Sequence, residues 1–267
     1  MGGPRVFSLK IYLLIVCILS WPFQLAFVFW GLEARPLLLV SMVMVGVGGY
    51  IAGRFVFKDG FEGAGWSWGK PWQYVMAFLL ALFLWAVPSF LEILSGVQKI
   101  APSFDPLSTA SLFLSSFLIT LVPAFGEEFG WRGYMLPRLL ARYSNRKALV
   151  LHGFITWVWH LPVLIVFGMQ AGGNMIISVA AILIISLIPT ILHAVVFAYF
   201  WSGSGLAVAT VYHSAFDEVR DTLQSKIGFG PLVEPWQMIS LSILGGVLIW
   251  KSGWIKSSRN KGGKYVV

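Results

Sequence analysis

Long apolar stretches separated by short polar loops make up most of the chain. A membrane-spanning helix needs about 20 consecutive apolar residues, and eight segments of this kind fit the sequence. The predicted spans are residues 9–31, 37–57, 71–94, 107–127, 148–168, 175–200, 205–222 and 236–250. The seventh span carries several charges in its second half, and the eighth is short. The pattern predicts an all-α polytopic membrane protein, with residues 1–267 in a single transmembrane domain of about eight helices.

Composition narrows the class of protein further. Hydrophobic residues make up 58% of the chain and charged residues 11%, whereas average globular usage includes about 25% charged residues. This excludes an ordinary soluble enzyme, a disordered protein and a coiled coil. A single cysteine, Cys17, excludes a disulfide and a cysteine-based metal site. We therefore expect membrane lipid, rather than nucleic acid, to surround this basic chain of net charge +8.

The distribution of Lys and Arg predicts the orientation in the membrane. Cytoplasmic loops of membrane proteins are enriched in these residues. With the N-terminus in the cytoplasm, 15 of the 19 basic residues fall in cytoplasmic segments. The four on the other side are Arg35, Lys99, Arg220 and Lys226. This asymmetry supports eight spans with both termini in the cytoplasm.

Ionisable side chains at membrane depth are costly, at about 2.5–3.5 kcal/mol each, and they commonly mark functional sites. Glu127, Glu128 and Arg132 lie at the cytoplasmic end of the fourth span, and His160 lies within the fifth. The seventh span carries His213-x-x-x-Asp217, a pair on one helix face. The three spans run in directions that place these groups towards the same side. We expect them to line one cavity that opens towards the cytoplasm.

The two adjacent glutamates are expected to have different roles. They diverge by about 100° around a helix. Glu128 and Arg132 stand four residues apart in the order that favours an ion pair, so Glu128 either orients the helix through this pair or acts in catalysis. Glu127 has no such local partner and is the better candidate for a general base, the alternative being a solvated helix end.

Other polar residues in the spans have structural interpretations. His152 and His193 are lone histidines, for which interhelical hydrogen bonding is the favoured interpretation. Glu218, Arg220 and Asp221 are interpreted as a solvated helix end. His160 has the structural alternative of a hydrogen bond to a neighbouring helix, and His213 with Asp217 that of a structural hydrogen-bonded pair.

The sequence Glu127-Glu128-x-x-x-Arg132, followed by His160 and His213-x-x-x-Asp217, resembles the CPBP family. This family contains the type II CAAX prenyl endopeptidases and related bacteriocin-processing or immunity-type membrane proteins. The motif-bearing core covers residues 107–222, in spans four to seven. The resemblance implies an intramembrane endopeptidase in which Glu127 activates water with His160. It also implies that His213 and the residue four positions later hold the substrate carbonyl oxygen.

Two positions depart from the family pattern. The family usually has Asn where this chain has Asp217. An ionised Asp cannot donate a hydrogen bond to an oxyanion, so Asp217 is either protonated, orients His213 or binds a metal ion. The family often has an aromatic residue four positions before the histidine of its second motif. That histidine is His160 here, and Thr156 occupies the earlier position.

Residue types alone leave two forms of water activation open. A carboxylate can act as base and then acid without a cofactor, and Arg132 beside the glutamates favours this form. Zinc held by Glu127, His160 and His213 is the alternative, although the HExxH pattern is absent. The expected partner is a peptide or lipidated protein substrate. A non-catalytic immunity or scaffold protein is the second hypothesis, and a proton-coupled transporter the third. The oligomeric state is left open.

Overall fold

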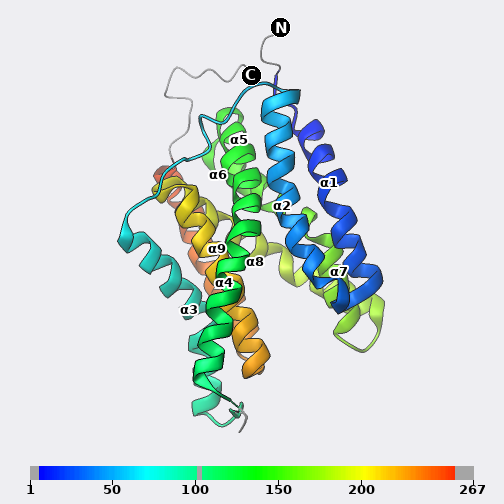
Figure 1. The fold of residues 1–267 in the computed structure, drawn as a ribbon, viewed down its shortest axis with the longest axis vertical. Coiled ribbons are helices and arrows are strands. Elements are labelled where there is room, and N and C mark those ends of the chain that lie inside the picture. Colours follow the sequence, from blue (N-terminus) through cyan, green and yellow to red (C-terminus); the bar gives the residue numbers. More distant parts are fainter. Residues whose placement is uncertain (1–5, 101–103, 256–267) are drawn as a thin grey trace.

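A computed structural model of the protein describes residues 6–100 and 104–255, and within these ranges it contains helices and no strands (Figure 1). The long helices are α1 (Leu9–Trp30), α2 (Arg35–Ile51), α3 (Pro71–Leu94), α4 (Pro106–Glu128), α6 (Asn145–Trp159), α8 (Met175–Ser204), α9 (Leu206–Lys226) and α10 (Val233–Trp250). The shorter elements are η1 (Gly31–Ala34), η2 (Ala52–Val56), η3 (Phe129–Met135), α5 (Leu136–Arg142), α7 (Leu161–Gln170) and η4 (Ser252–Trp254).

The all-α polytopic fold is confirmed. Among the described residues, six helical segments are long and apolar enough to cross a membrane. A seventh is obtained if α6 and α7, which are bent by 55° relative to each other, form one broken span. The remaining predicted span corresponds to α9, which is a continuous helix but too polar to pass the same test. Each of the eight predicted segments therefore coincides with one helix or one pair of consecutive helices.

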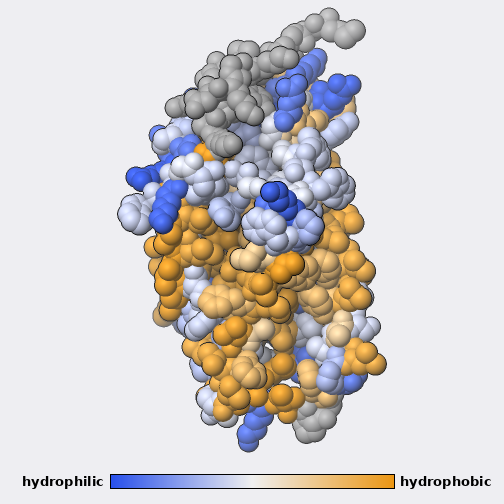
Figure 2. Space-filling model, turned by 90° about the vertical axis from the view of Figure 1, so that its left-hand side faces the viewer, coloured by the Kyte–Doolittle hydropathy of each residue, from blue (hydrophilic) through white to orange (hydrophobic). Residues whose placement is uncertain are grey.

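The outer surface is apolar where a membrane would contact it. Figure 2 shows a broad hydrophobic band below a polar end of the molecule. Large apolar side chains are exposed on several different helices, among them Leu79, Ile119, Ile184 and Ile243. In a soluble protein, so extensive an exposed apolar surface would be unusual. It is the expected outer surface of a membrane-embedded bundle.

Segments close to both ends of the described chain pack at the polar end. Phe7 packs edge-on against Tyr134, and Asn145 donates to the carbonyl oxygens of Ser252 and Ile255. At this end, Arg138 binds the Asp59 carboxylate at 2.8 Å. Of the basic residues used to predict the orientation, Arg5, Lys256, Arg259, Lys261 and Lys264 lie outside the described residues.

The packing of the helices brings the motif-bearing segments together. Helix α4 packs against α2 on one side and α9 on another, and α8 packs against α6, α7, α9 and α10. The buried side chains form two main apolar clusters. One contains Tyr12, Trp131 and Trp159, and the other contains Phe197 and Tyr212. The predicted site residues lie along the boundary between these two clusters.

Candidate active site

The first motif lies where α4 changes into a wider helix. Glu127 and Glu128 are the last residues of α4, and Arg132 belongs to the π-helical segment η3. Segments of π-helix are rare and frequently occur at functional sites. The Tyr12 hydroxyl donates to the Gly130 carbonyl oxygen at 2.7 Å, which ties this segment to α1. All three charged side chains are almost completely buried.

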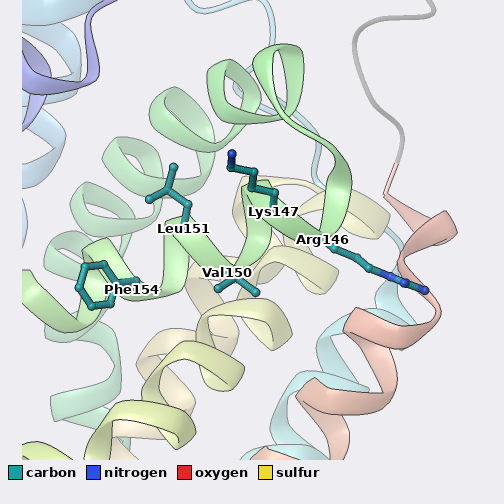
Figure 3. Close-up of a pocket in the computed structure, with 5 residues that line it drawn as sticks. All are labelled: Arg146, Lys147, Val150, Leu151 and Phe154. Atoms are coloured by element: carbon teal, nitrogen blue, oxygen red, sulfur yellow. The ribbon is translucent and has the colours of Figure 1, made fainter.

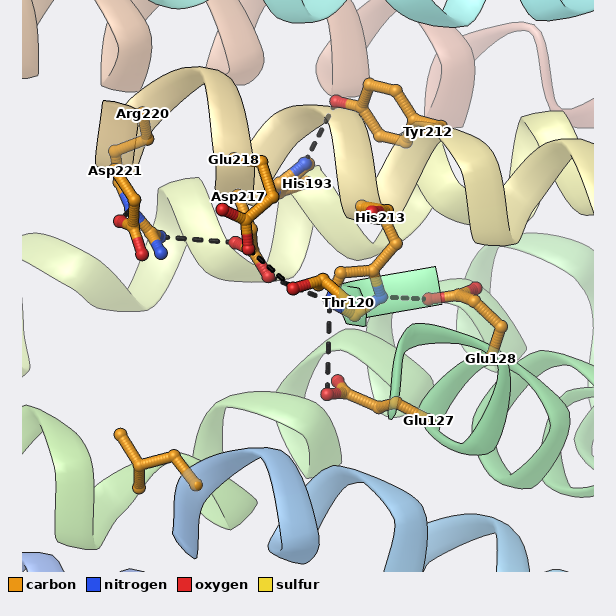
Figure 4. Close-up of polar contacts among 12 residues, drawn as sticks. Thr120, Glu127, Glu128, His193, Tyr212, His213, Asp217, Glu218, Arg220 and Asp221 are labelled. Atoms are coloured by element: carbon orange, nitrogen blue, oxygen red, sulfur yellow. Dashed lines mark hydrogen bonds and ion pairs between the residues drawn. The ribbon is translucent and has the colours of Figure 1, made fainter. Parts of the chain in front are cut away.

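Glu128 connects the first motif to α9. Its Oε1 atom accepts from Arg132 Nη1 at 2.9 Å, which confirms the ion pair expected from the sequence. The same oxygen accepts from His213 Nδ1 at 2.8 Å (Figure 4). The other oxygen, Oε2, is buried and has no hydrogen-bond partner among the described residues. A buried carboxylate next to an Arg and a His is well compensated in charge, and it fixes the distance between the two motifs.

His213 faces carboxylates through both ring nitrogens. Its Nε2 atom lies 3.4 Å from Asp217 Oδ2 and 4.0 Å from Glu127 Oε2. Asp217 is in turn 3.3 Å from Arg220 Nη1. Because carboxylates only accept hydrogen bonds, this arrangement suits an imidazolium that donates from both nitrogens. Of the alternatives that the sequence left open for Asp217, orientation of His213 fits this geometry best.

Two hydroxyl groups hold α4 and α9 in this alignment. Ser214 donates to the Phe117 carbonyl oxygen at 2.8 Å, and Thr120 donates to Glu218 Oε1 at 2.5 Å. The interpretation of Glu218 as part of a solvated helix end was therefore wrong, because its side chain is buried against α4. The sequence did contain a signal for these contacts, since small hydroxyl residues occur on both spans beside the motif residues.

His160 lies at the break between α6 and α7. It ends the first of these helices and precedes the second, and Nδ1 donates to the Thr156 carbonyl oxygen at 2.8 Å. In the neutral form, this bond leaves the Nε2 lone pair as the available atom. Within the described part of the chain, His160 makes no hydrogen bond or ion pair with Glu127. The structure therefore places His160 near the bend without joining it directly to the glutamates.

Aromatic side chains enclose the charged cluster. The Arg132 guanidinium carbon lies 4.4 Å from the centre of the Phe197 ring, and the His213 ring lies 4.9 Å from the same ring. Stacking of this kind favours a cation over the ring face. Phe197 belongs to α8, so the cluster receives side chains from α4, η3, α8 and α9. No sequence pattern distinguishes Phe197 from the many other aromatic residues of the spans.

No metal centre is formed by the described side chains. In residues 6–100 and 104–255, no group of three His, Cys, Asp or Glu residues has the arrangement of a metal site. The predicted zinc ligands Glu127, His160 and His213 therefore do not converge as a ligand set. A separate surface cavity of about 430 Å³ lies at the basic end (Figure 3) and contains none of the predicted site residues. Its lining residues are Arg146, Lys147, Val150, Leu151 and Phe154.

The architecture defines an all-α membrane protein with a buried Glu–His–Asp cluster, and the segment that carries this cluster is similar to a known family. Residues 109–219 match the family described as type II CAAX prenyl endopeptidase, Rce1-like. The match covers less than half of the chain, but it contains all six predicted site residues. The predicted resemblance to type II CAAX prenyl endopeptidases is confirmed over this segment.

A curated relative shows a similarity of the same kind over a shorter stretch. The chain is 46% identical over 50 residues to CAAX prenyl protease 2 of Methanococcus maripaludis. The aligned stretch is 19% of this chain and spans only 18% of the length of that relative. The similarity is therefore local, and the activity of the whole relative does not transfer with it.

Proposed function

We propose that this protein is an intramembrane endopeptidase that cleaves a peptide bond of a membrane-associated or prenylated substrate. The observation that carries the proposal is the environment of Glu127. Its carboxylate is almost buried, accepts no hydrogen bond from the described residues, and lies 4.0 Å from Nε2 of a histidine that two other carboxylates hold. A carboxylate in such a place is suited to activate water as a general base.

The proposed reaction uses Glu127 as base and then as acid. Glu127 takes a proton from water while the water oxygen bonds to the carbon of the scissile carbonyl group. His213 donates from Nε2 to the oxyanion that develops on the carbonyl oxygen, and Asp217 keeps this ring in position. Glu127 then gives the proton to the amine nitrogen as the C–N bond breaks. Preorganised donors of this kind typically contribute about 10²–10³ in rate.

The family match and the membrane setting support a prenylated substrate. A CAAX-type substrate is a polypeptide whose prenylated cysteine is followed by three residues, and its lipid keeps the cleavage site at the membrane. The proposed site opens towards the cytoplasmic side, since the first motif lies at the end of α4 that continues into the basic segment η3–α5. His160, at the bend beside this segment, is proposed to assist Glu127 in activating water once a substrate is bound.

A metal-free reaction is the favoured form of the proposal. The Arg132 cation, paired with Glu128 at 2.9 Å, already supplies positive charge beside the glutamates. We expect purified protein to contain little stoichiometric zinc and to keep its activity after exhaustive chelation. About one zinc per chain, with activity lost on removal and regained on its return, would contradict this expectation.

The test of the proposal compares active protein with Glu127→Gln. Purified protein in lipid nanodiscs is incubated with a farnesylated CAAX peptide and with the same peptide lacking the lipid. In parallel, membrane proteins from cells that carry either form are compared for new chain ends. We expect Glu127→Gln to lower the cleavage rate by at least about 10²-fold, as for a lost general base, with an almost unchanged melting temperature.

Glu92→Gln is a matched control for this experiment. Glu92 is also buried in a transmembrane helix, but its carboxylate accepts from the backbone of Gly230 and Leu232, in the loop between α9 and α10, and from none of the predicted site residues. The Glu92→Gln variant should therefore cleave at the wild-type rate. If wild-type protein cleaves neither peptide and alters no membrane protein, the non-catalytic immunity or scaffold hypothesis becomes the better account.

A further inference from the structure

His193 is a histidine of α8 that contacts the site from the side opposite to the glutamates. Its Nε2 atom lies 3.0 Å from the Tyr212 hydroxyl (Figure 4). Its ring lies 4.5 Å from the ring of Phe197 and 4.3 Å from that of Phe216, measured between centres. Phe197 is the residue that also packs against Arg132 and His213. The interhelical hydrogen bond expected for His193 is therefore confirmed, and its aromatic contacts also reach the surroundings of the motif residues.

His193 packs against the residues of α9 that adjoin the His213–Asp217 pair. Tyr212 immediately precedes His213 in the chain, and Phe216 immediately precedes Asp217. Contacts with both therefore place the His193 ring beside the second motif. Residue His193 is partly exposed rather than fully enclosed by these rings.

The hydrogen bond with Tyr212 determines which nitrogen of His193 carries the proton. Tyr212 is completely buried, and its hydroxyl makes no other hydrogen bond with the described residues. A buried hydroxyl that fails to donate is costly, so its hydrogen points to Nε2 of His193. A neutral imidazole that accepts at Nε2 carries its hydrogen on Nδ1. This Nδ1–H group has no hydrogen-bond acceptor among the described residues.

We propose that His193 is a further substrate-positioning residue, whose Nδ1–H donates to a carbonyl oxygen of the bound peptide, with Tyr212 fixing the required tautomer. The inference rests on the proposed peptidase function and specifies how that site holds its substrate. A peptide in an extended conformation presents carbonyl oxygens that need donors when water is excluded. The neighbouring carboxylates of Glu127 and Asp217 only accept hydrogen bonds, so they cannot supply a donor of this kind.

The test exploits the different positions of the amide groups in Asn and Gln. The side-chain NH2 of Asn reaches approximately the place of Nδ1, whereas that of Gln reaches the place of Nε2. In the nanodisc assay with the farnesylated peptide, we expect His193→Gln to lower kcat/KM by about tenfold, as for one lost hydrogen bond. His193→Asn should retain most of the wild-type value. Tyr212→Phe removes the hydrogen bond that fixes the His193 tautomer, so its kcat/KM should lie between those of the two His193 variants.

Binding provides a second readout that is independent of catalysis. The affinity for the fluorescent farnesylated peptide is measured with Glu127→Gln alone and combined with His193→Asn or His193→Gln. We expect only the Gln combination to weaken binding, again by about tenfold. If only the Gln combination weakens binding but wild-type protein cleaves no peptide, the peptidase proposal is refuted while the inference on His193 stands. The inference alone is overturned if His193→Asn and His193→Gln both cleave and bind like wild type. It is likewise overturned if both variants are impaired to the same extent.

Discussion

Among individual residues, Glu128 is the one that joins the two halves of the site. One oxygen of its carboxylate accepts from both Arg132 and His213, over 2.9 and 2.8 Å. Removing one partner of a buried ion pair leaves the other charge uncompensated, which costs about 3–5 kcal/mol. Glu128 therefore has mainly a structural role in the proposed mechanism, whereas its neighbour Glu127 carries out the chemistry.

This division of roles predicts different effects of substitution at the first motif. Glu128→Gln and Arg132→Gln should each lower the melting temperature clearly, whereas Glu127→Gln should not. The double variant Glu128→Gln/Arg132→Gln should be no less stable than either single one, because the two residues act as a unit. Thermal unfolding in detergent measures all four proteins. Full activity in Glu127→Gln, with activity lost in a stable Glu128→Gln, would show that the base is Glu128.

The residue Asp217 allows a separate prediction. Asp217→Asn keeps an oxygen that can accept a hydrogen bond from His213. Arg220 keeps its hydrogen bond to the Asp221 carboxylate, at 2.7 Å. We expect the substitution to lower kcat/KM by less than about tenfold, the effect of one hydrogen bond. Asp217→Leu, which removes the acceptor, should be far worse. If the Asn variant folds normally but is inactive, the charge of the carboxylate is itself required to hold His213 as an imidazolium.

At this scale, the sequence predicted local pairs and missed distant ones. The Glu128–Arg132 pair follows from a spacing of four residues on a helix, and the His213–Asp217 pair follows from the same rule. The bond between Glu128 and His213 joins residues 85 positions apart, and no spacing rule reaches that far. For His193 the sequence predicted an interhelical hydrogen bond but not the partner, because Tyr212 belongs to another helix.

At the scale of helices, the sequence predicted where each span lies but not how it is deformed. Apolar length identifies a span, because lipid requires it, and every predicted segment coincides with helix. The break at His160 and the π-helical turn in η3 depend instead on packing. Three glycines, Gly46, Gly126 and Gly130, allow α2 to approach the end of α4 and η3 backbone to backbone. A Cβ atom on Gly46 would lie 2.7 Å from the Gly126 carbonyl oxygen.

This close approach predicts a stability effect at a position without chemistry of its own. Gly46→Ala should separate α2 from α4, and overpacking of this kind typically costs about 1–3 kcal/mol. Because Gly126 precedes Glu127, cleavage activity should fall together with stability. The matched control is Gly246→Ala in α10, where an added Cβ meets no atom within 4 Å. Melting temperature and cleavage rate are measured for both, and equal values in the two variants would contradict a tight contact.

At the scale of the whole molecule, charge and architecture agree on two distinct ends. Asp59, Arg138 and the beginning of α6 gather at one end of the bundle, where Asn145 meets Ser252. Lys99 lies at the opposite end, following α3, where Gln98 hydrogen-bonds the Ile227 carbonyl oxygen. The fold separates the two ends, but a helix bundle alone does not define which of them faces the cytoplasm. That assignment comes from the excess of Lys and Arg in the predicted cytoplasmic segments.

The orientation predicts opposite accessibilities for two exposed lysines. In a Cys17→Ser background, Lys58→Cys at the basic end and Lys99→Cys at the other end are tested in intact cells with a membrane-impermeant thiol reagent. We expect the reagent to label Lys99→Cys only, since Lys58 is predicted to lie on the cytoplasmic side, and to label both after the membrane is permeabilised. A reporter fused after Val267 should likewise score as cytoplasmic. Labelling of Lys58→Cys alone in intact cells would invert the topology and place the opening of the site on the outer side, where a cytoplasmic prenylated substrate has no access.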